Sequence, residues 1–351
     1  MAEDADTPID RRKDIVFDDP SLLGAETDMY QSLLSAKFSS GMDLATQVTL
    51  QVIDPDWRMT KNNYFQITRD VYVRTTVDLL ATETVNSSTA TVLGDFNWLR
   101  LEIAAAAVSQ GKGSSPVWTL ECRNKAIQQM RRDKNPSSIT GSGQNWVINA
   151  AKKYEMGCVA ETTSKHRKIN KASNDRAADS TWDVIKSLAS DAKFVTFETQ
   201  GFLMFASQKY MLGLWGSGYA ENVPKDVILR SGAAEKSAYN AVRMAWPPKP
   251  NDEFKLLSMP DVRRSDNDPL AVQGSATLDR SSGVTLRPGM TIYLSGIPTF
   301  DAMYLISQVD YDLLQSGPVR IQFRSPEREE KDIKNYEVGA TAQQIFQDRG
   351  Y

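Results

Sequence analysis

Alternation of apolar and polar residues with a period of two is the feature that most constrains this chain. It runs through residues 48–52, 99–103 and 117–122, and again through 290–294 and Val319–Arg324. Such alternation is typical of strands with one face on a core and the other in water. Polar turn sequences separate these segments. The sequence therefore predicts two β-rich regions of short strands, the pattern of small barrels or sandwiches.

The period changes between the two β-rich regions. Apolar residues at helical spacing predict a helix over 144–156 and a second over Thr181–Ala192. Ser180 is expected to cap the second helix, with Asp183 three residues further on. Residues 193–206 then predict a β-hairpin around a glycine-containing turn. This stretch is predicted to be an α+β insert in a mainly β chain.

Composition at the two ends completes the predicted organisation. Both terminal stretches are polar and offer little to bury. The sequence predicts five regions in chain order: a flexible N-terminal arm (1–27), a first β domain (28–135), the α+β insert (136–212), a second β domain (213–326) and a C-terminal tail (327–351).

Charge and cysteine content exclude several classes of protein. Lys and Arg number 41 and Asp and Glu 44, a net charge of −3, which argues against a chain whose main task is gripping nucleic acid. Two cysteines cannot build a disulfide framework. Apolar runs are far shorter than the ~20 residues of a spanning helix. The opening residues show no secretory signal, so we expect folding in a reducing cytosol.

Enzyme signatures are weak throughout the chain. His166 is the single histidine and lies in a basic loop, and Cys122 and Cys158 are not clustered with other metal-ligating residues. Cys158 could pair with His166 as nucleophile and base, but no local signature accompanies them. Phosphate-binding glycine spacings are also missing. We therefore expect no catalytic, cofactor-binding or metal-binding residues.

Two stretches resemble the tail hub (baseplate hub) proteins of long-tailed bacteriophages and contractile injection systems. The first is DSTWDVIKSLA at 179–189, followed by FVTF at 194–197 and GFLMF at 201–205. The second is LRPGMTIYLSG at 286–296, followed by MYLISQV at 303–309. Their order and spacing agree with the predicted sequence of strands, insert and strands.

The resemblance implies a fold and a role. Each hub subunit in that family has two tail-tube-like β-barrel domains, here separated by the small α+β domain, and three subunits form a homotrimeric ring. The ring closes the distal end of the tail tube in the virion and forms the channel for DNA ejection, with no enzymatic activity and no cofactor. Implied partners are the distal tail and tail tube proteins, the tape-measure protein, and tail-tip, spike or fibre proteins. DNA passes the lumen without specific binding, and no stable membrane insertion is expected.

Candidate interface residues lie in three places. Ile15, Val16 and Phe17 in the arm could add a strand to a neighbouring chain or pack on their own domain, and the tail is expected to reach neighbouring chains through Tyr336 and Phe346. Trp215 and Tyr219 lie in a glycine-rich segment that is either a domain connector or a binding loop. Two other functions stay open: a cell-envelope-degrading tail enzyme, suggested by abundant carboxylates, and a receptor- or carbohydrate-binding tail-tip module, suggested by that aromatic segment.

Overall fold

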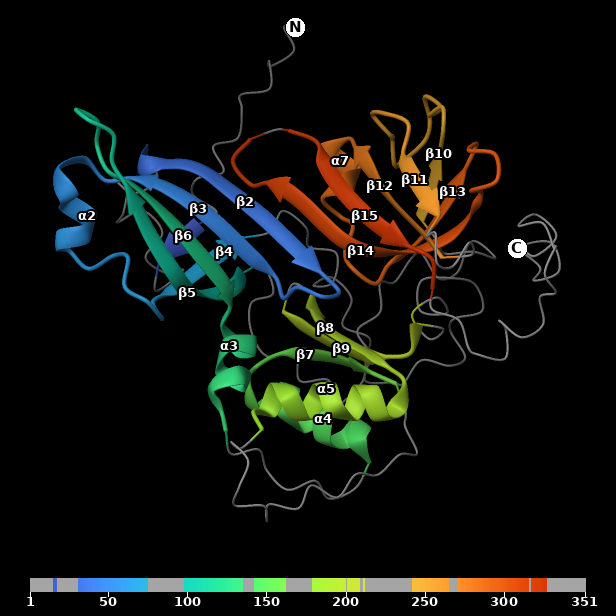
Figure 1. The fold of residues 1–351 in the computed structure, drawn as a ribbon, viewed down its shortest axis with the longest axis horizontal. Coiled ribbons are helices and arrows are strands. Elements are labelled where there is room, and N and C mark those ends of the chain that lie inside the picture. Colours follow the sequence, from blue (N-terminus) through green and yellow to red (C-terminus); the bar gives the residue numbers. More distant parts are fainter. Residues whose placement is uncertain are drawn as a thin grey trace, which may run out of the picture.

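The chain is described by a computed structural model that covers residues 15–17, 31–74, 98–134, 142–161, 179–199, 201–208, 211, 242–264, 271–315 and 317–326. The described part is mainly β. Two groups of strands lie side by side, and a smaller layer of helices and strands lies beneath the place where they meet (Figure 1).

The first half contains six strands with a non-sequential order in space. They are β1 (Ile15–Phe17), β2 (Leu33–Gly41), β3 (Gln47–Ile53), β4 (Asp70–Arg74), β5 (Trp98–Ser109) and β6 (Val117–Asn124). Their order in the sheet is β1-β4-β5-β6-β3-β2, and every neighbouring pair is antiparallel. A short helical stretch, η3 (Pro55–Trp57) and α2 (Arg58–Lys61), lies between β3 and β4.

The second half contains six further strands. They are β10 (Val242–Ala245), β11 (Asp261–Arg264), β12 (Val272–Leu278), β13 (Thr291–Ser295), β14 (Ala302–Asp312) and β15 (Val319–Arg324). Their order is β10-β13-β14-β15-β12-β11. The pairs are antiparallel except β10 with β13, which is parallel. The short helix α7 (Arg280–Gly283) lies between β12 and β13.

The two halves repeat one topology. Numbered from its first described strand, each half has the spatial order 1-4-5-6-3-2, with a short helix between its third and fourth strands. The fifth strand of each half also shifts register against the sixth, between Ile103 and Ala105 in β5 and between Ile306 and Gln308 in β14. Such β-bulges are position-specific features of a fold. The parallel pairing of β10 is the one difference in strand order or direction between the described halves.

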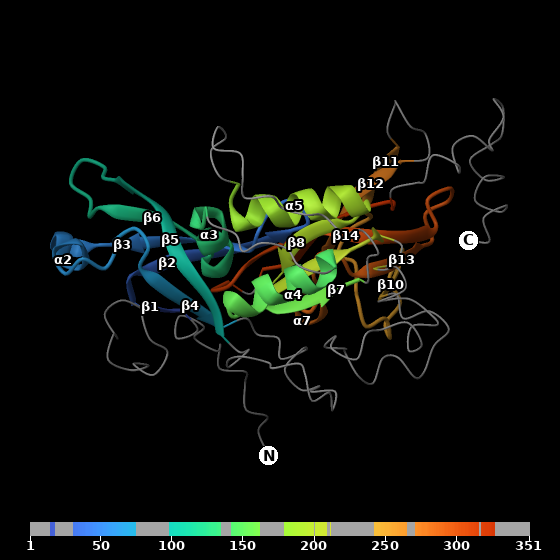
Figure 2. The same cartoon turned by 90° about the horizontal axis from the view of Figure 1, so that it is seen from below.

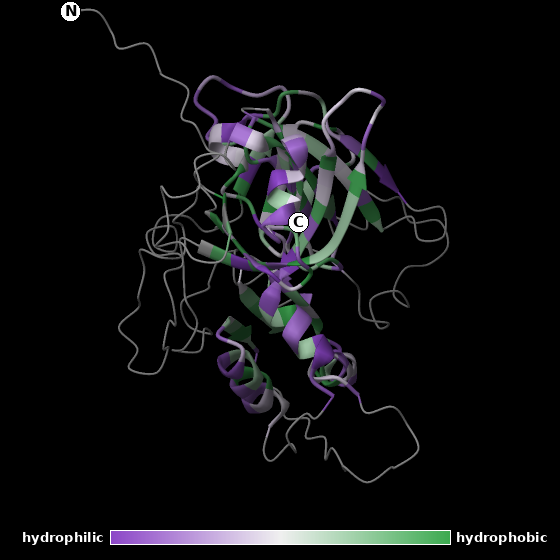
Figure 3. Ribbon diagram, turned by 90° about the vertical axis from the view of Figure 1, so that its left-hand side faces the viewer, coloured by the Kyte–Doolittle hydropathy of each residue, from purple (hydrophilic) through white to green (hydrophobic). Residues whose placement is uncertain are grey.

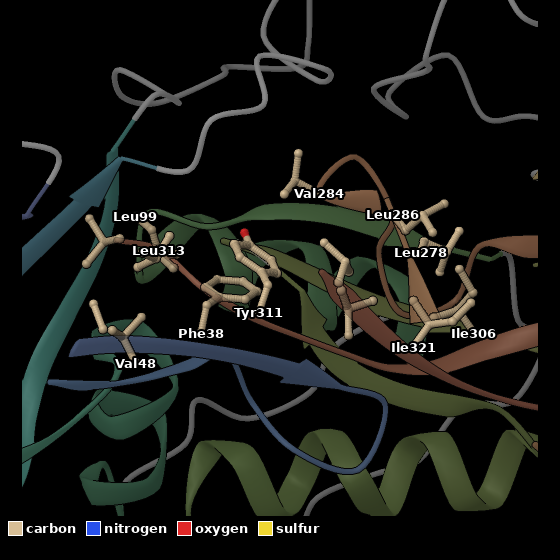
Figure 4. Close-up of a cluster of buried hydrophobic side chains, with 14 of the residues drawn as sticks. Phe38, Val48, Leu99, Leu278, Val284, Leu286, Ile306, Tyr311, Leu313 and Ile321 are labelled. Carbon is tan, nitrogen blue, oxygen red and sulfur yellow. The ribbon is translucent and has the colours of Figure 1, made fainter. Parts of the chain in front are cut away.

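A single strand pair joins the halves. β2 of the first half runs antiparallel to β14 of the second, so the twelve described strands of the halves form one sheet. Their buried apolar side chains make one continuous core, part of which is shown in Figure 4. No closed barrel is found among the described strands, and the predicted division into domains stays a prediction.

The insert forms a second, smaller layer. Its elements are α4 (Gly143–Lys153), β7 (Gly157–Ala160), α5 (Thr181–Ala192), β8 (Val195–Thr199) and β9 (Phe202–Ala206), reached through α3 (Lys125–Arg132). The sheet order is β7-β9-β8. Helices α4 and α5 cover the face of this sheet that is turned away from the large sheet (Figures 1 and 2).

The predicted secondary structure of the insert is largely confirmed. α5 has the expected bounds, and Ser180 and Asp183 form a reciprocal capping box at its start. β8 and β9 form the expected hairpin. The parallel strand β7 and the helix α3 were not predicted, because neither carries a long periodic pattern. None of the described helices is long and apolar enough to cross a bilayer.

Candidate functional site

The joint between β2 and β14 is the place where the chain connects its two halves. Its register pairs Phe38 with Tyr311, Ser39 with Asp310 and Gly41 with Gln308. On the core side the rings of Phe38 and Tyr311 stack, with centroids 4.6 Å apart (Figure 4). Both side chains are buried, at 1% and 5% exposed. The joint is therefore a packed part of the core as well as a ladder of backbone hydrogen bonds.

Polar side chains stabilise the opposite side of the same joint. The Ser39 hydroxyl donates to Asp310 Oδ1 over 2.5 Å, and Gln308 Nε2 donates to the same carboxylate over 2.9 Å. Backbone hydrogen bonds bracket the pairing, from Met42 N to the Ser307 carbonyl over 2.8 Å and from Leu313 N to the Ala36 carbonyl over 2.7 Å. Because Asp310 accepts from both strands of the joint, its carboxylate fixes their relative register.

The side chains that point away from the core form one continuous surface, which we call the polar face. It follows from the strand registers, since residues paired across strands share a face. Hydrophilic and hydrophobic residues alternate along the strands in Figure 3. From β5 to β11, strand by strand, the polar face includes Ala105 and Ala107; Thr119, Glu121 and Arg123; Gln47, Thr49 and Gln51; Lys37 and Ser39; Gln308, Asp310 and Asp312; Arg320, Gln322 and Arg324; Gln273, Ser275 and Thr277; Asp261 and Arg263.

Charges on the polar face nearly cancel. Its five cationic side chains, Lys37, Arg123, Arg263, Arg320 and Arg324, are set against the four carboxylates Glu121, Asp261, Asp310 and Asp312. Two of the arginines pair with carboxylates of the face: Arg123 lies 3.1 Å from Glu121 and Arg263 lies 3.0 Å from Asp261. Exposed pairs of this kind add little stability. Their effect is to leave a hydrophilic surface without a field of one sign, which neither attracts nor repels phosphates strongly.

A hollow of about 510 Å³ lies on the second half of this face. It lies between the β2–β3 turn and strands β11, β12, β14 and β15, with Asp43, Asp261, Arg263, Arg320 and Arg324 on its wall. Arg324 lies 3.5 Å from Asp43 at its edge. No group of three or more His, Cys, Asp or Glu residues is placed to hold a metal ion in the part of the chain described here.

The two cysteines are held in the neutral thiol form. Cys122 is fully buried in β6, and burial raises its pKa well above the usual range. Burial in β7 raises the pKa of Cys158 to about 12, so that this thiol stays protonated at neutral pH. A thiolate is the reactive form of cysteine, so this environment does not activate Cys158 as a nucleophile. His166, its possible partner in sequence, lies outside the described residues.

A buried carboxylate ties the insert to the large sheet. Glu198 of β8 accepts from the backbone N–H of Thr46 over 2.6 Å, from Gly201 N over 2.6 Å and from Asn124 Nδ2 over 3.2 Å. Thr46 lies at the β2–β3 turn and Asn124 ends β6, so both belong to the first half. Burial raises the pKa of Glu198, while its hydrogen bonds oppose that shift.

The other face of the insert packs on the second half. Leu305 of β14 shares a buried cluster with Phe197 and Met204 of the insert and with Met42 from the β2–β3 turn. A side chain at Gly289 would come within 2.8 Å of the Phe197 ring, so the glycine allows this close approach. The insert thus contacts both halves beneath their joint.

The candidate interface residues named from the sequence fall in different places. Ile15–Phe17 forms β1, which pairs with β4, and the side chains of Ile15 and Phe17 are buried in the core of their own half. This is the second of the two alternatives raised by the sequence, and their role at an interface stays a prediction. Outside the described residues lie Trp215, Tyr219, Tyr336 and Phe346, and with them most of the arm and the whole tail.

Sequence reasoning missed the joint itself. β2 was not predicted, and the partner of β14 was not assigned. The alternation of polar and apolar residues in 308–312 carried the signal that this stretch has two different faces. It carried no information on which distant strand lies beside it.

Comparison with known proteins supports the fold. No protein-family model matches the chain, and no curated protein sequence matches it. Among solved structures it is similar to a 43 kDa tail protein of prophage MuSo2 from Shewanella oneidensis, with 7% identity and a TM-score of 0.50, over 83% of this chain and 92% of that one.

Two other solved structures are similar over comparable lengths. A tail protein from Neisseria meningitidis has 12% identity and a TM-score of 0.48, over 84% of this chain and 92% of that one. An E. coli type VI secretion component is described as structurally similar to T4 tail proteins gp27 and gp5. It has 10% identity and a TM-score of 0.49, over 93% of this chain and 79% of that one. The MuSo2 protein is a phage tail protein, the kind of protein that the two sequence stretches resemble. The chain has the fold of a prophage tail protein.

Proposed function

We propose that this protein is a structural tail hub: three copies form a ring that closes the distal end of a phage tail tube. In this proposal each half is one tail-tube-like barrel unit, and the α+β insert braces the two units from one side. The ring anchors tail-tip proteins below and the tail tube and tape-measure proteins above. It is made in the host cytoplasm and works at the tip of the virion tail, without catalysis.

The observation that carries the proposal is the repeated topology of the two halves. A chain with two equivalent units, present in three copies, offers six equivalent positions to a six-fold tube and three to a three-fold tip. The same strand order, the same bulge and the same helix position in both halves are what such equivalence requires. In this proposal the arrangement has a structural role and catalyses no reaction.

The polar face supports the channel part of the proposal. A surface that lines a DNA channel must be hydrated and must not hold phosphates, because affinity for DNA rises with each cationic contact. The polar face is hydrophilic over seven of its eight strands, all but the alanines of β5, and its cations and carboxylates nearly cancel. We therefore propose that it faces the lumen and that DNA passes without specific binding.

Two measurements test the proposal. Light scattering on the purified protein, alone and with its tail-tip partners, is expected to give a species of about 117 kDa, three times the 39.1 kDa chain. A cryo-electron microscopy map of the intact particle is expected to place a three-fold ring of this chain at the distal end of the tube, with the polar face inward. A ring elsewhere in the particle, or a polar face turned outward, would refute it.

A further inference from the structure

The joint inside the chain uses only half of the pairing surfaces that the repeat creates. In the joint, the second strand of one half (β2) pairs with the fifth strand of the other half (β14). Since both halves contain both strands, each chain has one further fifth strand, β5, and one further second strand, β11.

Both of these further strands have an open edge among the described residues. β4 pairs with β5 only as far as Glu102, so residues 104–109 meet no described strand on the side opposite β6. β11 pairs with β12 on one side and with no described strand on the other. In the second half, the corresponding length of β14 is the part that β2 occupies.

The repeat fixes which residues correspond. When the bulges of the fifth strands are aligned, Val108 of β5 takes the place of Tyr311 in β14. When the second strands are aligned through their third-strand partners, Val262 of β11 takes the place of Phe38 in β2. Phe38 and Tyr311 are the residues that stack across the joint. The register of the joint therefore matches Val108 with Val262, one apolar residue with another.

The same register defines the neighbouring pair on the polar face. Ala107 takes the place of Asp310, and Arg263 takes the place of Ser39, so Ala107 would lie opposite Arg263. Small side chains fill this edge of β5, since residues 104–107 are all alanine.

Exposure distinguishes the used strands from the open ones. Phe38 and Tyr311 are buried, whereas Val108 is 44% exposed and Val262 is half-buried. Leu257 and Met259, which directly precede β11, are 55% and 58% exposed. Apolar side chains gathered at an open strand edge are typical of a surface that another strand covers.

We propose that β11 of one copy adds to the 104–109 edge of β5 in the next copy, in the register that β2 and β14 use within the chain. The contact is heterologous, because one copy offers β11 and the next offers β5. It extends the sheet and its polar face from copy to copy by β-strand addition. The inference rests on the proposed function in supposing that copies assemble, but it does not fix how many copies close the ring.

A disulfide test uses two exposed positions of the polar face. Ala107→Cys and Arg263→Cys correspond to a pair in the joint without direct backbone hydrogen bonds, where side chains come closest. Equal amounts of the two single variants, mixed and oxidised, are expected to give covalent dimers, while each single variant alone gives none. The double variant is expected to give a ladder that ends in a closed covalent ring.

The controls address register and folding. Ala107→Cys combined with Asp261→Cys shifts one partner by two residues on the same face and is expected to crosslink at least about tenfold more slowly, because such diagonal neighbours are roughly 7–8 Å apart. Val108→Glu places a charge in the proposed contact and is expected to weaken self-association at least about tenfold. Its thermal midpoint is expected to stay unchanged, since the side chain is exposed in the single chain.

The outcomes separate this inference from the proposed function. A covalent ring of three supports both, and a closed ring of another number supports the strand pairing and contradicts the trimer. Trimers that form without the crosslink overturn the strand pairing and leave the trimer intact. A folded double variant that stays monomeric and uncrosslinked at high concentration overturns the pairing as well.

Discussion

The stacked pair at the joint allows a direct test of whether the halves are one folded body. Phe38→Ala removes a ring that is 1% exposed, and Tyr311→Ala removes one that is 5% exposed. Losing a buried aromatic side chain forfeits its transfer free energy and leaves a cavity, so each change should cost about 3–5 kcal/mol. Tyr311→Phe keeps the ring and is expected to cost much less, which makes it the matched control.

A double-mutant cycle isolates the contact across the joint. The rings lie 4.6 Å apart at an interplanar angle of 25°, a geometry that adds roughly 0.5–1.5 kcal/mol beyond the buried area. The double variant should therefore lose less stability than the sum of the single losses, by about that amount. Free energies of unfolding from urea titrations, with the slope m checked for constancy, measure all four corners of the cycle.

A second cycle supplies the reference for independence. Phe65 packs on Trp118 of β6, three strands away from β14 in the sheet, so Phe65→Ala and Tyr311→Ala should add within about 0.5 kcal/mol. The joint would be refuted if the losses of stability from Phe38→Ala and Tyr311→Ala also added within about 0.5 kcal/mol. Two separate unfolding transitions for the two halves would refute it as well.

Other residues give further tests. Glu198→Ala leaves the buried donors Thr46 N and Asn124 Nδ2, and the half-buried Gly201 N, without their acceptor and should cost at least about 3 kcal/mol in urea unfolding. Burial raises the pKa of Glu198 above its ordinary value of 4.5, so the folded chain keeps that proton to higher pH than the unfolded chain does. The free energy of unfolding of the wild type, relative to that of Glu198→Gln, should therefore fall as pH rises from about 4.5 through the raised pKa. A difference in unfolding free energy that does not change with pH would contradict this. Trp182→Ala should cost about 3–5 kcal/mol in thermal or urea unfolding, since the ring is 5% exposed, and near-neutral stability would mean that the face of α5 is wrongly placed. Gly274→Ala would bring a methyl group within 2.5 Å of the Asp261 carbonyl and should destabilise the protein by about 1–3 kcal/mol. Because β11 would be displaced, the disulfide between the Ala107→Cys and Arg263→Cys variants should also form more slowly. An unchanged free energy of unfolding and an unchanged crosslinking rate would argue against this packing. In a Cys158→Ser background, native protein should give almost no thiol signal from Cys122 with a colorimetric disulfide reagent until denaturant is added, and rapid native labelling would contradict the burial of Cys122.

Local sequence patterns predicted several of the observed helices and strands. The capping residues Ser180 and Asp183 and the apolar stripe behind them predicted α5 with its observed bounds. Alternation in Val319–Arg324 predicted both the strand and its two faces, with Val319, Ile321 and Phe323 buried. These features depend on neighbours within a few residues, which a sequence shows directly.

The candidate site could not be predicted in the same way. The joint pairs residues about 270 positions apart, such as Ser39 and Asp310. The sequence of neither strand indicates which distant strand it pairs with. A strand edge is generic in its hydrogen bonds, so register is set by packing and turns that only the folded chain assembles. Glu198 was equally hidden, because two of its three donors, Thr46 N and Asn124 Nδ2, lie 152 and 74 positions away in the sequence.

The single carboxylate of Glu198 gives the insert a mechanical role. Its three hydrogen bonds run to the β2–β3 turn, to the end of β6 and to its own hairpin, so a pull on the insert loads the first half at the turn that leads into the joint. The apolar contact with Leu305 loads the second half at the same time. Force applied to this layer is thus shared between the two halves of the chain.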